Sequence, residues 1–222
     1  MNNFKILLAT AAMAVSGAAI AGPSYTYVDL GYVQGDGIDA SSLLGGIPNE
    51  IGNFESDGFT IRGSKSISDN FHVQASYTDG DSLGGNGTLL GSDYDGYSIG
   101  VGYNPAITDS MDLVARIGYS DLDAEFGALV SDLLSIPEGL TDYSVSGINL
   151  EVGPRAMIGD NLELNAAATL FIGEIETIAG DIDQTDVGLR FGGEYYFGNI
   201  SLGVDVETGF IDQANLHVRY TF

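Results

Sequence analysis

Five arginines and seven carboxylates carry most of the polar chemistry that this sequence offers. Each of them occupies the polar position in a stretch where polar and apolar residues alternate, so all twelve side chains are expected on one face of their elements. They are Arg62, Arg116, Arg155, Arg190 and Arg219, with Asp29, Asp112, Glu151, Glu163, Glu194, Asp205 and Glu207. Arginine binds a facing carboxylate through two parallel hydrogen bonds. We therefore predict a charged network that either fills an interior or constricts a passage through it.

The two histidines, His72 and His217, are the first candidates for a general base. His72 follows directly on a short turn, and His217 lies on the charged face of the last predicted strand. Neither is in a long loop that a substrate would reach, and no Gly-rich phosphate loop or zinc-ligand spacing accompanies them. We predict no catalytic residues, no enzyme activity and no cofactor.

The formal net charge of -24 comes largely from acidic residues in the predicted connections. Asp79-Gly80-Asp81 and Asp93-Tyr94-Asp95-Gly96 offer the oxygen ligands that Ca²⁺ prefers, but neither run matches an EF-hand loop. A solvated acidic surface is the favoured interpretation, bridging of divalent cations to lipid phosphates is the alternative, and no metal site is predicted. Such a surface repels nucleic acid. The chain has no cysteine, which excludes disulfides and thiolate metal sites.

The last seven residues show which kind of element positions these side chains. Polar residues alternate strictly there with the apolar Leu216, Val218, Tyr220 and Phe222, which is the period of a β-strand with one apolar face. The same alternation predicts ten strands, over 25–34, 58–66, 71–78, 94–103, 111–120, 146–157, 162–173, 186–197, 200–208 and 214–222. A tilted strand of about nine residues spans roughly 23 Å, close to the apolar band of an outer membrane.

The connections between these strands alternate between short and long. The short ones are 68–70, 104–110, 159–161 and 198–199, and the long ones are 34–57, 79–93, 121–145, 174–185 and the smaller 209–213. A chain of strands satisfies its backbone inside a membrane only as a closed barrel. The sequence therefore predicts an all-β, ten-stranded antiparallel transmembrane β-barrel with short periplasmic turns, long acidic outer loops and both termini in the periplasm. Eight strands are the alternative, if parts of 111–120 or 200–208 are loop.

Residues 1–21 have the pattern of a cleaved secretory signal peptide. Lys5 supplies the positive charge, an apolar run follows, and Ala19-Ile20-Ala21 is a cleavage site of the A-x-A type. We expect the exported chain, 22–222, to form a single barrel domain.

With these features, the chain resembles the small outer-membrane β-barrel proteins of Gram-negative bacteria, in the opacity-protein, OmpA-barrel-like and porin-like group. The resemblance covers 22–222 and rests on the start, 25–32, and on the closing strand, 216–222. It implies that Leu216, Val218, Tyr220 and Phe222 form a signal for the barrel-assembly machinery. It also implies that the lipid bilayer and lipopolysaccharide surround a monomeric protein. Members of the group are mostly eight-stranded, and the ten strands predicted here depart from that pattern.

Three observations on the inner face and the loops remain open. Gly96, Ser98, Gly100 and Gly102 leave one strand almost without inward side chains, so either long arginines lie across it or a water path remains. Tyr25, Tyr27 and Phe171 have inward parity, meaning that the two-residue alternation places them on the inner face of their strands. Aromatic residues are expected to face lipid, so this placement indicates a wrong register or a bulge. Apolar residues at helical spacing predict a short amphipathic helix over 126–134, with a role in packing, in plugging the mouth or in adhesion.

Three classes of function follow from this fold. The first is a structural or surface-interaction barrel whose lumen is largely filled by arginines and carboxylates. The second is a narrow, weakly cation-preferring diffusion channel, and the third and most distant is an outer-membrane enzyme. The location predicted for all three is the bacterial outer membrane.

Overall fold

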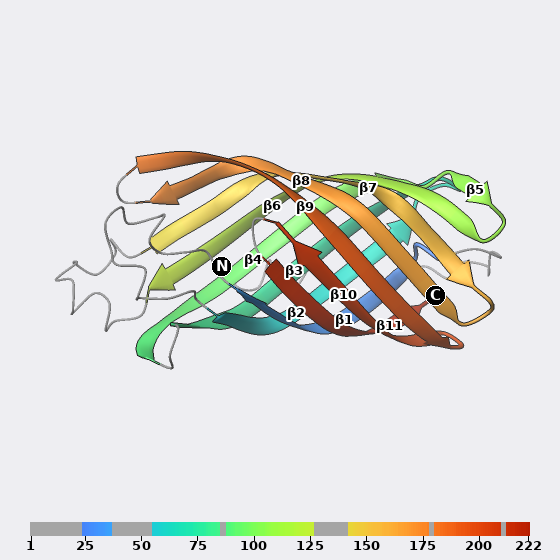
Figure 1. Cartoon of the computed structure of the whole chain (residues 1–222), viewed down its shortest axis with the longest axis horizontal. Coiled ribbons are helices and arrows are strands. Elements are labelled where there is room, and N and C mark those ends of the chain that lie inside the picture. The colour runs from blue at the N-terminus through green and yellow to red at the C-terminus, as the bar shows by residue number, and fades with distance from the viewer. Residues whose placement is uncertain (1–23, 37–54, 85–87, 127–141, 178–179, 210–211) are drawn as a thin grey trace.

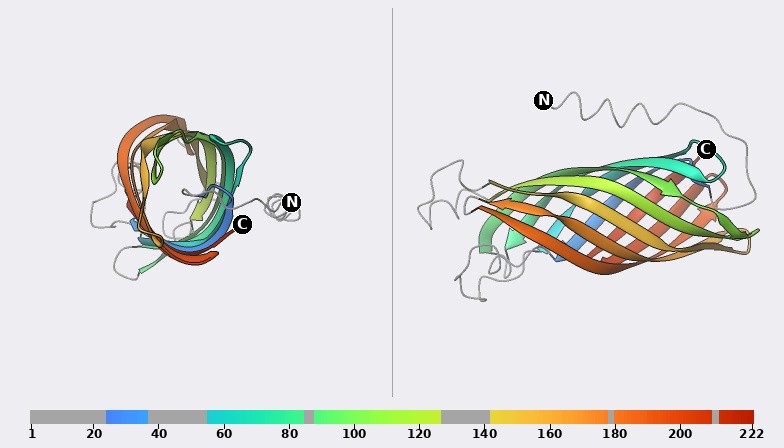
Figure 2. Two further views of the ribbon diagram at one scale, coloured as in Figure 1. Left: turned by 90° about the vertical axis from the view of Figure 1, so that its right-hand side faces the viewer. Right: turned by 90° about the horizontal axis from the view of Figure 1, so that it is seen from above.

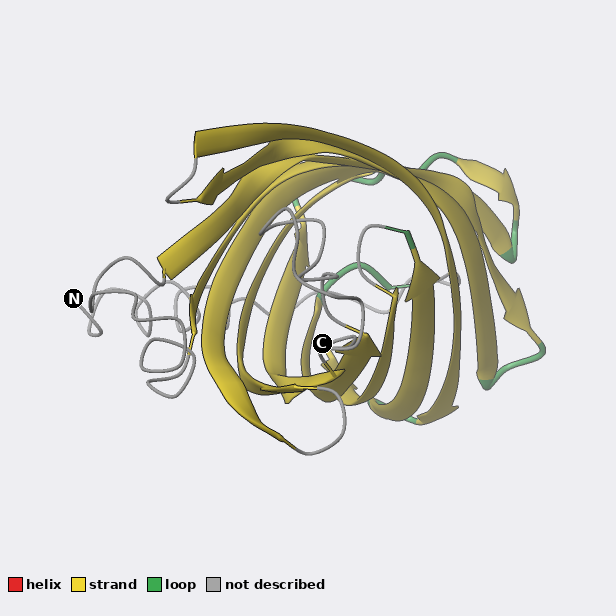
Figure 3. Cartoon of the chain, turned by 60° about the vertical axis from the view of Figure 1, so that its left-hand side comes forward, coloured by secondary structure: helices red, strands yellow, loops and turns green. Residues whose placement is uncertain are grey.

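The computed structural model describes residues 24–36, 55–84, 88–126, 142–177, 180–209 and 212–222 (Figure 1). The predicted signal peptide lies outside the described residues, and so does the helix expected over 126–134 except for Phe126, which ends a strand. Within the described part, all regular elements are strands (Figure 3). They are β1 Tyr27–Asp36, β2 Glu55–Ser66, β3 Phe71–Gly84, β4 Thr88–Tyr103, β5 Ala106–Thr108, β6 Met111–Phe126, β7 Asp142–Ile158, β8 Leu162–Thr177, β9 Gly180–Phe197, β10 Ile200–Thr208 and β11 Asp212–Thr221.

Ten of these strands close into an antiparallel barrel. Each pairs with its neighbour along the chain, β1 also pairs with β11, and β4 pairs with β6. The eleventh strand, β5, is a three-residue flap that pairs only with β6, outside the ring. The end-on view in Figure 2 shows the closed ring. The predicted ten-stranded barrel is therefore confirmed, and the eight-stranded alternative is wrong. No helix in the described part of the chain is long and apolar enough to cross a membrane.

We call the two rims of the barrel the turn end and the loop end. The turn end carries the short connections, and both ends of the described chain lie there because Tyr27 pairs with Thr221. The loop end carries the connections that follow β1, β3, β6, β8 and β10.

Several strands extend further toward the loop end than the sequence predicts. The predicted connections 79–93 and 174–185 are largely strand, since β3 reaches Gly84 and β8 reaches Thr177, and strand also covers 121–126 and 142–145 of the predicted connection 121–145. Asp79, Asp81 and Asp93 lie in these extensions and not in a loop. The apolar alternation ends where a strand leaves the membrane, because an outward side chain there faces water, but the backbone ladder continues.

The burial pattern is the reverse of that in a water-soluble protein. On β11, Leu216 and Val218 are 55% and 52% exposed, whereas His217 and Arg219 are 3% and 6% exposed. The same alternation runs through β10. Large apolar side chains on the outside and charged ones inside are expected where the surroundings are lipid and the interior is polar.

Aromatic side chains mark both rims of the outer surface. Tyr32, Phe59, Tyr97 and Tyr119 are exposed toward the loop end, and exposed aromatic side chains near the turn end include Phe71, Tyr103, Tyr195, Phe197 and Tyr220. Tyr and other amphipathic rings are favoured at the interface between lipid headgroups and hydrocarbon.

Candidate functional site

Asp29 on β1 is the centre of a charge network inside the barrel. Its carboxylate, which is only 1% exposed, accepts from Arg62 Nε at 3.2 Å and from Arg219 Nη2 at 3.0 Å. Arg62 and Arg219 come from the strands on either side, β2 and β11, in direct register with Asp29. One buried anion thus binds two cations, a geometry in which each carboxylate oxygen has its own donor.

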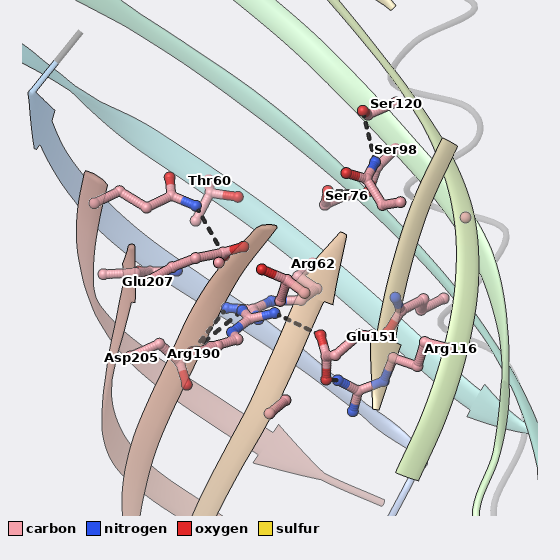
Figure 4. A pocket seen from close by; sticks show the side chains of 18 of the residues that line it. Thr60, Arg62, Ser76, Ser98, Arg116, Ser120, Glu151, Arg190, Asp205 and Glu207 are labelled. Atoms are coloured by element: carbon pink, nitrogen blue, oxygen red, sulfur yellow. Dashed lines mark hydrogen bonds and ion pairs between the residues drawn. The ribbon is translucent and has the colours of Figure 1, made fainter. Parts of the chain in front are cut away.

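The network continues across the lumen through Asp205 and Glu151. Asp205 Oδ2 lies 3.6 Å from Arg62 Nη2 and 3.7 Å from Arg190 Nη2. Arg190 Nη1 donates to Glu151 Oε2 at 3.2 Å, and Arg116 Nη1 donates to the other oxygen of Glu151. Figure 4 shows these side chains directed toward one another from separate strands.

A second branch runs from Arg219 to Glu194. Arg219 Nη1 pairs with Glu194 Oε2, and Ser201 Oγ donates to Glu194 Oε1. His217 lies between two carboxylates, with Nε2 3.9 Å from Glu194 and Nδ1 3.7 Å from Asp205. The Ser201 hydroxyl donates its hydrogen bond to Glu194 and not to His217, so this cluster lacks the nucleophile–base contact of a catalytic triad.

Two residues of the predicted network are placed differently from the rest. Glu207 has no ion pair among the described side chains and accepts from Gln213 Nε2 at 3.3 Å. Arg155 belongs to a separate group near the turn end, where its Nε and Nη2 both lie 2.7 Å from the oxygens of Glu163. Tyr196 also donates to Glu163, at 2.8 Å.

Tyr25, just before β1, crosses the lumen at the turn end. Its ring lies 4.4 Å beneath the guanidinium of Arg155 and is stacked on His72, and its hydroxyl donates to Asp112 at 3.0 Å. Arg155 Nη2 also donates to the backbone carbonyl of Ser24 at 3.1 Å. Arg155 is on β7, five strands from β1 in either direction round the ring. These contacts therefore bridge opposite walls, and we call Ser24 and Tyr25 the crossbar.

His72 completes the floor beside the crossbar. Its side chain is fully buried, its Nδ1 is 3.0 Å from Asn104 Oδ1, and Arg116 Nε approaches its Nε2 at 3.4 Å. Through Arg116, the floor is continuous with the charge network described above.

A cavity of about 450 Å³ occupies the lumen on the other side of this floor. The network residues Arg62, Glu151, Asp205 and Arg219 line it, as does Arg155. Tyr25, His72, Asp112 and Asn104 do not line it, so the space ends above the crossbar. Toward the loop end its walls carry serine, threonine, asparagine and glycine, together with Tyr94, Phe171, Asp186 and Glu207.

Inward glycines make room for the two histidines. Gly102 faces His72 across β3 and β4, and Gly203 faces His217 across β10 and β11, and in each pair the imidazole occupies the space where a Cβ would be. On the inner face of β4, Gly102 is therefore covered by His72 and not by an arginine.

Gly102→Ala is therefore expected to destabilise the barrel. His72 is fully buried between Tyr25, Asn104 and Arg116 and cannot move away, so overpacking of about 1–3 kcal/mol is expected. The measurement is urea-induced unfolding in detergent or lipid. The matched control is Gly193→Ala, because Gly193 faces outward and its Cβ would meet Leu164 only at 3.4 Å. Equal stabilities of the two variants would contradict the proposed fit.

The outer surface of the loop end carries rows of carboxylates. Asp57, Asp81 and Asp93 are register partners on β2, β3 and β4. Below them, Tyr32 and Tyr97 donate to aspartates on their neighbouring strands. Among the described residues, no group of three or more His, Asp or Glu side chains is arranged to hold a metal ion.

The residues predicted as an assembly signal lie on the outer surface of the closing strand. Leu216, Val218 and Tyr220 are exposed, and the ring of Phe222 packs edge-on against Tyr220 at 5.0 Å. The Phe222 amide donates to the carbonyl of Thr26 at 3.1 Å, which joins the C-terminal residue to the start of the chain.

The crossbar and its contacts are what sequence reasoning missed. Tyr25 and Tyr27 were noted for their inward parity, but the predicted explanation, a wrong register or a bulge, is wrong, because β1 pairs without interruption on both sides. Both rings face inward since each lies under a guanidinium: Arg155 covers Tyr25, and Arg219 covers Tyr27 at 3.7 Å. Phe171 also faces inward, where it packs against Val145 and Ile175.

Lipid-exposed apolar strands around a buried polar network define an integral outer-membrane β-barrel. The family model of the outer membrane protein β-barrel domain matches residues 6–194. The chain therefore belongs to this family and to the outer membrane of Gram-negative bacteria.

Solved structures are similar to this chain at low sequence identity. The translocator domain of the autotransporter NalP from Neisseria meningitidis is 12% identical, with a TM-score of 0.50 over 100% of this chain and 95% of that one. Ail, the attachment invasion locus protein of Yersinia pestis, is 13% identical, with a TM-score of 0.44 over 90% and 100%. An outer membrane channel from Pseudomonas putida F1 is 11% identical, with a TM-score of 0.47 over 94% and 100%. No curated protein matches the sequence.

Proposed function

We propose that the protein is a closed outer-membrane barrel with a structural or surface-interaction role in the cell envelope. The observation that carries this proposal is the crossbar: Tyr25 and Ser24 reach from β1 to Arg155 on the opposite wall, and the cavity ends above them. If both termini face the periplasm, as we expect, the crossbar closes the lumen on the periplasmic side.

The charge network supports the same role by holding the barrel wall together from inside. It joins residues of β1, β2, β6, β7, β9, β10 and β11 through ion pairs. Buried charges that are paired and hydrogen-bonded are tolerated, whereas the loss of one partner is costly. A lumen used for rapid passage of ions does not need such a set of mutually neutralised groups.

The outer surface suits the partners expected for such a barrel. Its exposed apolar strands fit lipid tails, and its acidic loop-end rows fit a headgroup layer that contains divalent cations. We further propose that Leu216, Val218, Tyr220 and Phe222 are recognised during barrel assembly and that the protein performs no catalysis.

A narrow, weakly cation-preferring channel is the second candidate, and the 450 Å³ cavity favours it. One experiment separates the two: single-channel current through the refolded chain 22–222 in a planar bilayer under a salt gradient. We expect folded protein, verified by heat-modifiable gel mobility, to give no steady current. Steady conductance with a cation preference would instead establish the channel and overturn the closed-lumen proposal.

A further inference from the structure

The loop-side half of the cavity has a lining unlike that of the charged half. Its inward residues on β3, β4 and β6 include Ser76, Ser98 and Ser120, which are register partners in one row. Ser76 Oγ and Ser98 Oγ are 2.7 Å apart, and Asn149 Nδ2 donates to Ser120 Oγ at 2.7 Å. Figure 4 shows the three serines together, apart from the arginines. A hydroxyl offers one donor and two acceptor positions, so these groups retain hydrogen-bonding capacity toward the cavity.

In the next row toward the turn end, the part of the wall formed by β4 and β6 has no inward side chain. Gly100 on β4 and Gly118 on β6 are register partners, and both line or adjoin the cavity. The atoms nearest to a Cβ at either position are backbone atoms of the other strand, such as the carbonyl oxygens of Ile117 at 2.8 Å and Ile99 at 3.0 Å. Gly102, by contrast, is covered by a histidine. The Gly100–Gly118 pair is therefore a flat, uncovered part of the wall.

An aromatic ring lies in the neighbouring row, which also contains Gly100, Gly118 and Asn149. Phe171 on β8 is the register partner of Asn149 on β7, and both line the cavity. The Phe171 ring lies along the wall, because its edge approaches Gly147 and Gly173 where Cβ atoms would be, at 2.7 Å in each case. The ring packs against the apolar cluster of Val145 and Ile175 and forms an apolar part of the cavity wall.

The charge of the cavity further restricts what it can hold. Asp186, the register partner of Phe171, and Glu207 also line the cavity, whereas the group formed by Ser76, Ser98, Ser120, Asn149 and Phe171 contains no ionisable side chain. Below it, the arginines are paired with carboxylates, so the floor presents no large excess of either sign. An anionic ligand would lose hydration here without gaining an unpaired cation, and Asp186 and Glu207 would repel it.

We propose that this part of the cavity is a binding site for a neutral sugar, a mono- or disaccharide, that enters from the loop end. Ser98, Ser120 and Asn149 supply hydrogen bonds to hydroxyl groups, and Phe171 stacks on the apolar face of the sugar ring. The volume lies within the range of about 300–1,000 Å³ that is usual for small-molecule pockets. The site does not depend on the floor being closed, so a conducting barrel would leave this proposal standing.

The test is binding of defined sugars to the folded chain 22–222 in a detergent that has no sugar headgroup. Maltose and glucose are the neutral probes and glucuronate is the charged one, and saturation-transfer NMR and isothermal titration provide the readout. We expect the neutral sugars to bind and glucuronate to bind more weakly. Ser98→Ala is expected to weaken binding about fivefold, the effect of one lost hydrogen bond.

Phe171→Leu, which keeps an apolar side chain but removes the ring face, is also expected to weaken binding. Ser110→Ala, in the turn before β6, is the matched control and should bind as the original chain does, because Ser110 is exposed and lies away from the cavity. The proposal is overturned if neither neutral sugar binds, if glucuronate binds as well as glucose, or if the Ser98 and Phe171 variants bind like the Ser110 variant.

Discussion

Replacing Tyr25 by alanine is expected to turn a silent barrel into a conducting one. The tyrosine ring lies between His72 and the Arg155 guanidinium, and its hydroxyl donates to Asp112, so a single side chain connects three strands across the turn end. Its removal joins the cavity above the floor to the periplasmic side. The measurement is single-channel current in a planar bilayer, compared with the unmodified chain.

Tyr25→Phe provides the matched control. Phenylalanine keeps the stacking on His72 and the position beneath Arg155 and loses only the hydrogen bond to Asp112, so this variant should stay silent. The crossbar is not the seal if folded Tyr25→Ala protein carries no current, or if the unmodified chain conducts as well as the variant does.

The current through the Tyr25→Ala variant should prefer cations. Arg155 remains neutralised by two bonds to Glu163, whereas Asp112 loses its hydroxyl donor. The entrance at the loop end is also acidic, and a mouth of one sign concentrates the opposite ion. Raising the salt concentration should weaken this preference, because exposed charges are screened.

The strands of this barrel were predictable because apolar and polar residues alternate along each of them with a period of two residues. On β10, the alternation of Leu202, Val204 and Val206 with Ser201 and Asp205 is enough to assign both faces. The strand lengths were not predictable, since the outward residues of the extensions, such as Asp79 and Asp81, are as polar as those of a loop.

The pairing of charges inside the lumen could be predicted only in part. Parity places Arg155 and Glu163 on the same face of adjacent strands, and the short turn between them brings them together. Parity does not show that Arg190 meets Glu151, or that Tyr25 reaches Arg155, since these partners come from strands that are not neighbours. Contacts across a lumen depend on the tilt and stagger of the whole barrel, and no local pattern in the sequence encodes them.

The parity violations were nevertheless the signal that pointed to the floor. An aromatic residue with inward parity needs an inward partner, and the partner available in a charged lumen is a guanidinium. For Tyr25 and Tyr27, a cation–π contact was thus a better interpretation than a bulge. The inward Phe171 instead belongs to an apolar cluster with Val145 and Ile175.

Asp29→Asn is expected to cause the largest loss of stability of any single change in the charge network. The Asp29 side chain is fully buried and accepts from Arg62 and Arg219. An asparagine of the same shape carries no charge and has one oxygen in place of two, so two buried cations lose their shared anion. The loss of one partner from a buried ion pair costs about 3–5 kcal/mol. Urea-induced unfolding measures this cost, and Asp57→Asn, on the exposed loop-end surface, is the control that should change little.

A second substitution distinguishes a lost ion pair from general disruption. Arg219→Met removes one of the two cations that Asp29 binds and keeps an unbranched chain beneath which Tyr27 can pack. The double variant should therefore be less destabilised than the sum of the two single variants, because one buried charge is no longer left without its partner. Strict additivity would mean that Asp29 and Arg219 are not coupled. In that case Glu194, the other carboxylate bound to Arg219, would compensate its charge alone.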